Sequence, residues 1–172
     1  MWRWFDGPSG LPRRVAVAVL ALAGFLVSMQ LAFFQYGLTD TVWDPWFGDG
    51  SVKVLDSAFS RSLPVRDAAL GAVAYLIELV LEVTGGLSRW RRPWHVLLLG
   101  LVSAAMAVTA IGLVAMQIFV LHAFCTLCLV SAALSLTIPL FVAEEVVVAW
   151  GQLRRGRRYG LTWSRAIRGQ VV

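Results

Sequence analysis

Four apolar runs, each about as long as a membrane crossing, dominate this sequence. They cover residues 15–35, 68–84, 95–120 and 124–148. A helix needs about 20 mostly apolar residues to cross the hydrocarbon core of a bilayer. The second run is the weakest of the four, because Glu78 and Glu82 interrupt it one helical turn apart. The pattern predicts an all-α integral membrane protein, a bundle of four transmembrane helices.

Composition supports this class of protein and limits the number of domains. Hydrophobic residues make up 59% of the chain and charged residues only 15%, whereas about a quarter of a typical soluble domain is charged. We expect a cytoplasmic N-terminal segment over 1–14, one transmembrane domain over 15–148 and a basic cytoplasmic tail over 149–172. The net charge of +5 does not predict nucleic-acid binding, because the basic residues cluster beside the apolar runs. We expect the protein to be embedded in the lipid bilayer.

The basic clusters predict how the helices are oriented. Cytoplasmic loops of membrane proteins carry an excess of Lys and Arg. An even number of crossings puts the three clusters on one side, so we expect both termini in the cytoplasm and a long external loop over about 39–66. All eight tryptophans lie at or beyond the ends of the runs, as expected for residues that prefer the interface. The clusters are Arg3, Arg13 and Arg14; Arg89, Arg91 and Arg92; and Arg154, Arg155, Arg157, Arg158, Arg165 and Arg168.

The only two cysteines form a CxxC motif, Cys125 to Cys128, at the external start of the fourth run. Unpaired N–H groups and the helix dipole at a helix N-terminus lower the pKa of a thiol, and the external side permits disulfide exchange. We expect Cys125 to lie nearer the water and Cys128 one turn deeper. Two other interpretations remain open. Buried cysteine can be a small hydrophobic residue, and His122 would complete only three metal ligands where structural zinc takes four.

Helix packing and the acidic residues of the second run lead to two further expectations. Gly71 and Gly100 lie among small residues at helical spacing, which lets helix backbones approach closely in lipid. We expect both at helix–helix contacts. Glu78 and Glu82 are functional candidates as intramembrane acids, or they snorkel toward the cytoplasm or pair with Arg89 or Arg91.

With these motifs in place, the sequence resembles the vitamin K epoxide reductase (VKOR) family over roughly residues 15–148. Four runs, a long first external loop and a CxxC motif opening the fourth helix carry the resemblance, together with the stretches 51–60 and 69–76. It implies a membrane thiol–disulfide oxidoreductase that passes electrons from an external thiol to a lipid quinone, either ubiquinone or menaquinone. A multi-pass protein of a bacterial plasma membrane is expected, with a thioredoxin-like or other thiol protein as external partner.

The resemblance also implies roles for the two cysteines and for a third residue. Cys128 would face the quinone, and Cys125 would exchange disulfides with the external thiol. Asp67 lies near the place where the family hydrogen-bonds a quinone carbonyl, although an aspartate there also suits a helix cap.

Three further residues are candidates for the quinone site. His122 would relay protons to a reduced quinone, or it is a solvated residue of an interfacial turn. Trp46 and Phe47 would cover the quinone as an aromatic cap, or they anchor the loop in the headgroup region.

The sequence departs from the family in its external loop. Trp43 and Ser51 stand where the family has two loop cysteines, and the hydroxyl of Ser57 cannot replace a thiol in exchange. Three possibilities remain open: an external thiol meets Cys125 directly, a partner supplies the missing cysteines, or redox activity is lost. The last corresponds to a non-catalytic membrane subunit that binds a partner protein.

Overall fold

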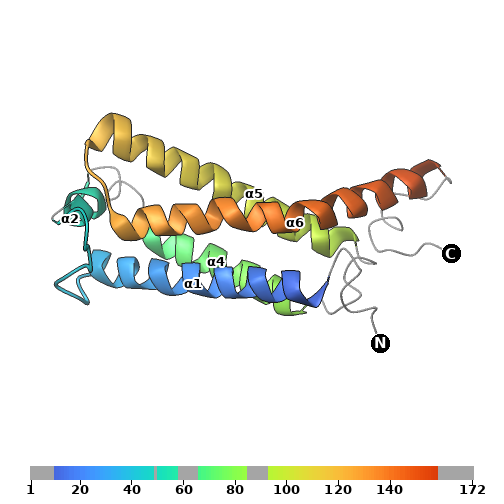
Figure 1. Ribbon diagram of the computed structural model, residues 1–172, viewed down its shortest axis with the longest axis horizontal. Helices are drawn as coiled ribbons and strands as arrows, with labels where there is room; N and C mark the ends of the chain where they lie inside the picture. Colours follow the sequence, from blue (N-terminus) through green and yellow to red (C-terminus); the bar gives the residue numbers. More distant parts are fainter. Residues whose placement is uncertain (1–9, 49, 58–65, 85–92, 159–172) are drawn as a thin grey trace.

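The computed structural model describes residues 10–48, 50–57, 66–84 and 93–158, and these residues are helical apart from their connections. Four long helices run alongside one another, and the short helix α2 (Gly50–Leu55) lies at one end of the bundle (Figure 1). The helix α5 continues directly into a π-helical turn, η2 (Gln117–Leu121). The four long helices are α1 (Leu11–Gln35), α4 (Asp67–Thr84), α5 (Pro93–Met116) and α6 (Thr126–Arg158).

Three of the described segments are long and apolar enough to cross a membrane: Leu11–Gln35, Pro93–Leu121 and Thr126–Gly156. The chain is therefore a multi-pass helical membrane protein, as its composition predicts. The helix α4 has 18 residues and differs from the other three because it contains three acidic residues. It nevertheless packs against α1 and α5, and its two glutamates point into the bundle, where both are buried.

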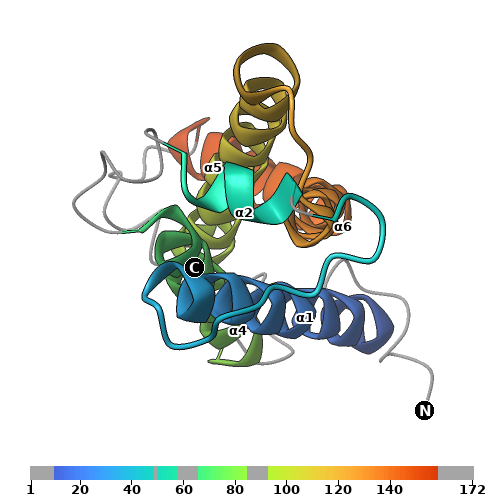
Figure 2. The same cartoon turned by 90° about the vertical axis from the view of Figure 1, so that its left-hand side faces the viewer.

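Different elements form the two ends of the bundle. The start of α1 and the end of α6 lie at one end, and α2 and the start of α6 lie at the other (Figure 1). We call these the Arg14 end and the CxxC end. Viewed from the CxxC end, α2 lies across the bundle near the first turn of α6 (Figure 2). This short helix, inside a segment expected to be a loop, is not evident from the sequence.

The fourth helix is longer than expected. The apolar run ends near Val148, but α6 continues to Arg158. Gln, Leu and Arg are good helix formers, and Ala149 and Leu153 remain buried, so the helix still has a packed face beyond the apolar run. Part of the segment expected as a basic tail is therefore a helical extension of the bundle.

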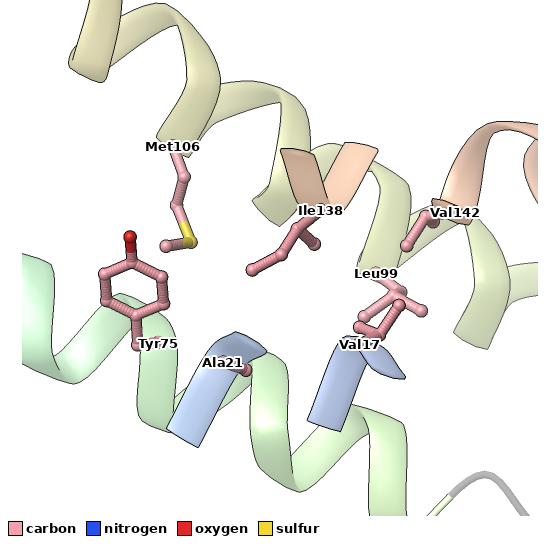
Figure 3. Packing of buried hydrophobic residues seen from close by; sticks show 7 residues of the cluster. All are labelled: Val17, Ala21, Tyr75, Leu99, Met106, Ile138 and Val142. Atoms are coloured by element: carbon pink, nitrogen blue, oxygen red, sulfur yellow. The ribbon is translucent and has the colours of Figure 1, made fainter. Parts of the chain in front are cut away.

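All four long helices contribute side chains to one hydrophobic cluster (Figure 3). The ring of Tyr75 lies in this cluster, and its hydroxyl contacts the Ser135 hydroxyl at 2.7 Å and donates to the Ser131 carbonyl at 2.7 Å. A buried tyrosine hydroxyl requires such partners. The cluster consists of Val17, Ala21, Tyr75, Leu99, Met106, Ile138 and Val142.

Glycines allow the helices to approach closely, as predicted for two of them. A Cβ on Gly100 would lie 2.5 Å from the Val146 side chain of α6, and one on Gly71 would lie 3.4 Å from the Ser28 hydroxyl of α1. The tightest of these helix contacts involves a glycine that the small-residue pattern did not single out. A Cβ on Gly24 would lie 2.3 Å from the Tyr75 ring.

The expectation that Glu78 and Glu82 snorkel toward water is wrong. Both side chains are buried, and Arg14 of α1 supplies the charge for Glu82. The Arg14 Nε donates to Glu82 Oε1 at 3.4 Å, and Arg14 Nη2 donates to the Glu82 carbonyl at 2.5 Å. The arginines expected to pair with these glutamates, at 89 and 91, lie outside the described residues.

Candidate active site

Cys125 occupies the capping position of α6. Its carbonyl accepts the first intrahelical hydrogen bond, from the Leu129 N–H at 3.0 Å. Its sulfur accepts the N–H of Cys128 at 3.2 Å, which is the contact that a Ser or Asp cap makes with the third helical residue. The sulfur therefore satisfies one of the unpaired N–H groups at this helix end. Both cysteines are free thiols.

The connection from α5 to α6 positions this cap. The helix widens into the π-helical turn η2, a feature that often marks functional sites. His122 then adopts a left-handed conformation with φ of 47°, which reverses the chain within a few residues. The side chain of Gln117 is buried in η2 and its Oε1 accepts the Cys125 N–H at 3.4 Å. Gln117 was not singled out from the sequence, and the only sign of it there is a polar residue within an otherwise apolar run.

A carboxylate ties the loop segment that follows α1 to the start of α6. Asp44 Oδ1 accepts hydrogen bonds from the Thr126 hydroxyl at 2.5 Å and the Phe47 N–H at 3.0 Å. Its Oδ2 accepts from the Ser51 hydroxyl at 2.5 Å and the Ser51 N–H at 3.3 Å. We call Asp44, Ser51 and Thr126 the Asp44 clasp. Partial burial alone would raise the pKa of Asp44, but the hydrogen bonds outweigh it and lower this pKa to about 2. The Asp44 carboxyl group is therefore ionised at neutral pH.

The helix α2 packs directly on the residues that precede Cys125. A Cβ on Gly50 would lie 2.3 Å from the Phe124 carbonyl oxygen, so only glycine allows the start of α2 to come this close. The rings of Phe47 and Phe124 are 5.5 Å apart. Beneath them, Cys125 packs with Leu31, Leu55 and Leu127 in a second hydrophobic cluster.

These contacts give Cys125 a reactive but covered sulfur. The Cys128 thiol donates a hydrogen bond to it, and this contact outweighs the effect of burial and lowers the pKa of Cys125 to about 7. The Ser51 hydroxyl and the Cys128 N–H act in the same direction. The Ser51 hydroxyl has one proton for two acceptors, Asp44 and Cys125, so α2 links the clasp to the reactive sulfur.

Other segments cover the two cysteines to different extents. Cys125 is 0% exposed, and Cys128 is only half-buried although it lies one turn further into α6. The reason is tertiary: α2 and the Asp44 clasp cover the helix start, while the flank of the helix at Cys128 remains partly open. The expectation that Cys125 lies nearer the water and Cys128 deeper in the bilayer stays a prediction.

Cys128 faces the junction of α1 and α4. It packs at the same cluster as Ala68, and Asp67 lies within electrostatic reach of its sulfur. Gln35, the last residue of α1, joins the two helices: its Nε2 donates to Asp67 Oδ1 at 2.5 Å, and its Oε1 accepts the Ala68 N–H at 3.3 Å. Sequence reasoning selected Asp67 but missed Gln35, which is far from it in the chain.

The structure brings only some of the remaining candidates to the thiols. Phe47 reaches the site through Phe124. Trp46 is 74% exposed and His122 is exposed, so both lie on the outer surface of the site. The Trp46 backbone N–H donates to Asp44, which gives this residue a role through its main chain.

A free dithiol at the head of a helix, inside a bundle of apolar helices, defines a membrane protein with a candidate thiol-redox site. The comparison with protein families agrees with this class. The model of the vitamin K epoxide reductase family matches residues 15–143. Because the match covers well over half of the chain, the protein belongs to the VKOR family. No curated protein matches the chain.

Proposed function

We propose that this protein is a membrane thiol–disulfide oxidoreductase that transfers electrons from an external thiol to a lipid quinone through Cys125 and Cys128. The observation that carries the proposal is the Cys125 sulfur, which caps α6 and has a pKa lowered to about 7 by the Cys128 thiol. A thiol with this pKa is substantially ionised at neutral pH, and the thiolate is the species that exchanges disulfides. Membership in a family that uses quinones supports the electron acceptor.

The two cysteines take different roles because their surroundings differ. Cys125 is the better thiolate and lies beneath α2, so we assign it to exchange with the external thiol. Cys128 is half-buried on the flank of the helix, where an apolar molecule from the bilayer can approach, and we assign it to the quinone side. Forming the Cys125–Cys128 disulfide then releases the two electrons that the thiol partner supplied.

The residues beside Cys128 fit a quinone headgroup. Such a group has an apolar ring and two carbonyl oxygens, and when bound it accepts two electrons. The pair Gln35 and Asp67 supplies hydrogen-bonding side chains at the junction of α1 and α4, and Leu31 and Ala68 supply an apolar wall. Phe47 contributes as part of the cover over Cys125.

A thiol reaches Cys125 only if α2 moves, because the sulfur is fully covered. Asp44 holds α2 through two hydrogen bonds to Ser51 and holds the start of α6 through one to Thr126, and opening this clasp exposes the start of α6. A thioredoxin-like protein, or another thiol protein on the external side, would have to displace this cover or arrive while it is open. Ser51 lies beside Cys125, where a family loop cysteine would be, so the chain itself has no thiol to relay electrons there.

We further propose four membrane crossings, with both termini in the cytoplasm of a bacterial cell. Eighteen residues of α4 extend about 27 Å at 1.5 Å per residue, close to the thickness of a hydrocarbon core of about 30 Å. Arg13 and Arg14 of α1 lie at the same end of the bundle as Arg154 and Arg155 of α6. Excess positive charge at one end favours that end in the cytoplasm, which places the CxxC end and the 39–66 segment outside.

Serine substitutions at each cysteine test the assignment. Purified protein is mixed with a dithiol and a soluble quinone, and quinone reduction is followed by absorbance. Cys125→Ser should abolish exchange with the dithiol. Cys128→Ser, treated instead with the disulfide of a monothiol, should accumulate a mixed disulfide at Cys125: the Cys125 thiolate breaks the reagent's S–S bond and releases one thiol, and no Cys128 thiol remains to resolve the product. Ser57→Ala serves as a control in the same external segment. Wild-type electron flow in both cysteine variants would refute the proposal.

A non-catalytic subunit that binds a partner protein is the second candidate. Two observations favour it: Trp43 and Ser51 replace the loop cysteines, and Cys125 is fully covered. In that case neither serine substitution changes electron flow, the wild type reduces no quinone with any thiol donor, and the variants differ only in thermal stability.

A further inference from the structure

A line of polar side chains runs through the apolar interior from the CxxC motif toward the Arg14 end. On α6, Cys128 is followed by Ser131 and Ser135 at steps of three and four residues, which place them along one face. On α4, Tyr75 is followed by Glu78 and Glu82 at the same steps. Polar groups are costly in a membrane interior and usually mark a function there. The thiol chemistry described above uses none of these residues beyond Cys128.

Contacts between helices join the two faces. The Tyr75 hydroxyl lies 3.3 Å from the Ser131 hydroxyl and 2.7 Å from the Ser135 hydroxyl. In Figure 3 this hydroxyl is seen at the edge of the hydrophobic cluster beside Met106. One turn further along α4, Glu78 is 0% exposed, and its Oε1 lies 2.5 Å from the Ser103 hydroxyl of α5.

Proton counting at Ser103 indicates that Glu78 carries a proton. The Ser103 hydroxyl has one proton but two acceptors in reach, the Leu99 carbonyl at 2.9 Å and Glu78 Oε1 at 2.5 Å. One proton shared between two acceptors makes two weak hydrogen bonds, whereas both contacts are full hydrogen bonds when Ser103 donates to Leu99 and the Glu78 carboxylic acid donates to Ser103. The other carboxyl oxygen, Oε2, is buried with no hydrogen-bond partner in the described structure. An ionised carboxylate in that setting would be strongly unfavourable.

The line reaches the polar end of the bundle through Glu82. This glutamate lies one turn beyond Glu78 on α4 and contacts Arg14. The Arg14 side chain is 11% exposed, so the chain of polar groups begins at a residue in contact with the surroundings of the Arg14 end. The titratable groups near Glu78 along this line are therefore Tyr75 and Glu82 on its own helix, and Arg14 of α1.

We propose that Glu78, Tyr75, Ser135 and Ser131 form a proton path that carries protons from the Arg14 end of the bundle to the quinone at Cys128. The path rests on the proposed function, because it serves quinone reduction. It would make the redox reaction electrogenic, with protons taken up on the side opposite the thiol partner. The residues of the path relay protons and do not touch the thiol partner.

The balance of the reaction explains why such a path is needed. A partner dithiol that reduces the Cys125–Cys128 disulfide loses two protons, of which Cys128 keeps one and the other leaves with the ionisation of Cys125. Re-forming the disulfide from the Cys125 thiolate and the Cys128 thiol gives the quinone two electrons and one proton. The quinol requires two protons, so one more must arrive. The path supplies it through Glu78, which is reprotonated from the Arg14 end.

Proteoliposomes loaded with a pH-sensitive dye test the path directly. An external dithiol starts the reaction, quinone reduction is followed by absorbance, and only molecules with the Arg14 end inside contribute to internal alkalinisation. The expected result is uptake of about one internal proton per quinone reduced by these molecules, as for a relay through intramembrane acids, abolished by a protonophore. Glu78→Gln and Tyr75→Phe should remove the uptake and slow quinone reduction. Glu144→Gln, a change at an exposed glutamate paired with Arg13, is the matched control and should do neither.

A measurement that needs no turnover accompanies this test. The infrared spectrum of resting protein should contain the carbonyl band of a buried protonated carboxyl group, shifted in heavy water and absent in Glu78→Gln but present in Glu144→Gln. Quinone reduction without internal alkalinisation would overturn the path and leave the proposed function intact. Absence of quinone reduction in the wild type would refute the proposed function and the path with it. A missing carbonyl band would overturn the role of Glu78 in either case.

Discussion

Asp44 accepts a hydrogen bond from the Thr126 hydroxyl at 2.5 Å, although the two residues lie 82 positions apart in the chain. The same carboxylate binds the hydroxyl and N–H of Ser51 at the start of α2. One side chain thus holds the loop segment that follows α1, the short helix and the first turn of α6 together over Cys125. Access to the Cys125 sulfur therefore depends on the hydrogen bonds that the Asp44 carboxylate accepts.

Removing this carboxylate should uncover Cys125. Asp44→Ala leaves the donors of Ser51, Thr126 and Phe47 without their acceptor, and we expect a loss of about 1.5–3 kcal/mol in the free energy of unfolding, as for hydrogen bonds to charged groups. Labelling of Cys125 by a water-soluble thiol reagent should accelerate severalfold. Asp40→Ala, at an exposed position of the same segment, is the control. Equal labelling rates in the two variants would show that the clasp does not cover the thiol.

A thiol introduced at position 51 should form a disulfide with Cys125. The Ser51 hydroxyl lies within hydrogen-bonding reach of the Cys125 sulfur, so Ser51→Cys brings two sulfur atoms close with little movement of α2. Non-reducing mass spectrometry after mild oxidation should identify this bond. Ser57→Cys, further along the same segment, should remain a free thiol. If both variants form the bond to the same extent, the position of α2 described here is wrong.

The ionisation of Cys125 should follow pH with an inflection near 7. Its pKa is lowered from an ordinary value of 9.0 chiefly by the Cys128 thiol, so Cys128→Ala should move the inflection upward. Ultraviolet thiolate absorbance measures this without requiring access to the sulfur. Because the pKa is lowered in the folded state, ionisation also stabilises the fold at alkaline pH, and this contribution disappears as the pH falls through about 7. An unchanged inflection in Cys128→Ala would assign the shift to another cause.

Packing of α1 on α4 should depend strongly on Gly24. A methyl group there would lie 2.3 Å from the Tyr75 ring, and the ring cannot move away without losing its hydrogen bonds to Ser131 and Ser135. Gly24→Ala should cost about 1–3 kcal/mol through overpacking. Gly112→Ala, where a Cβ would meet nothing within 4 Å, should be neutral or stabilising, since alanine favours helix more than glycine does. Thermal unfolding in detergent compares the two, and similar melting temperatures would contradict the contact.

The topology can be tested with two reporters. A reporter fused after Val172 should be active only in the cytoplasm, and one inserted near Gly50 should be active only outside. The excess of arginine at the Arg14 end is the physical reason for this orientation. Reporters on the same side of the membrane would exclude an arrangement of four crossings.

The helices were largely predictable from the sequence, and the cover over the site was not. Apolar runs of sufficient length and small residues such as Gly100 are local signals, because the lipid imposes the same requirements on any chain. The burial of Cys125 depends instead on Gly50 meeting Phe124 and on Asp44 meeting Thr126, contacts between segments far apart in sequence. No local pattern encodes them.

The buried glutamates are a second example of contacts that the sequence pattern does not predict. Their presence in an apolar run is evident, but their partners are not: Arg14 comes from α1 and Ser103 from α5. Sequence proximity favoured the arginines just beyond the second run. For Glu82, tertiary packing brings Arg14 into contact, because the start of α1 lies beside the end of α4.

Covering Cys125 also has a consequence for chemical damage. A thiolate near neutral pH is the form that peroxides oxidise to sulfenic and then irreversibly to sulfinic acid. Small oxidants dissolved in water reach sulfur only where the surface is open, and Cys125 has no exposed area. The sulfur with the greatest tendency to be lost by over-oxidation is therefore the one that dissolved oxidants reach last, and the lifetime of the protein under oxidative stress should depend on how firmly Asp44 keeps α2 in place.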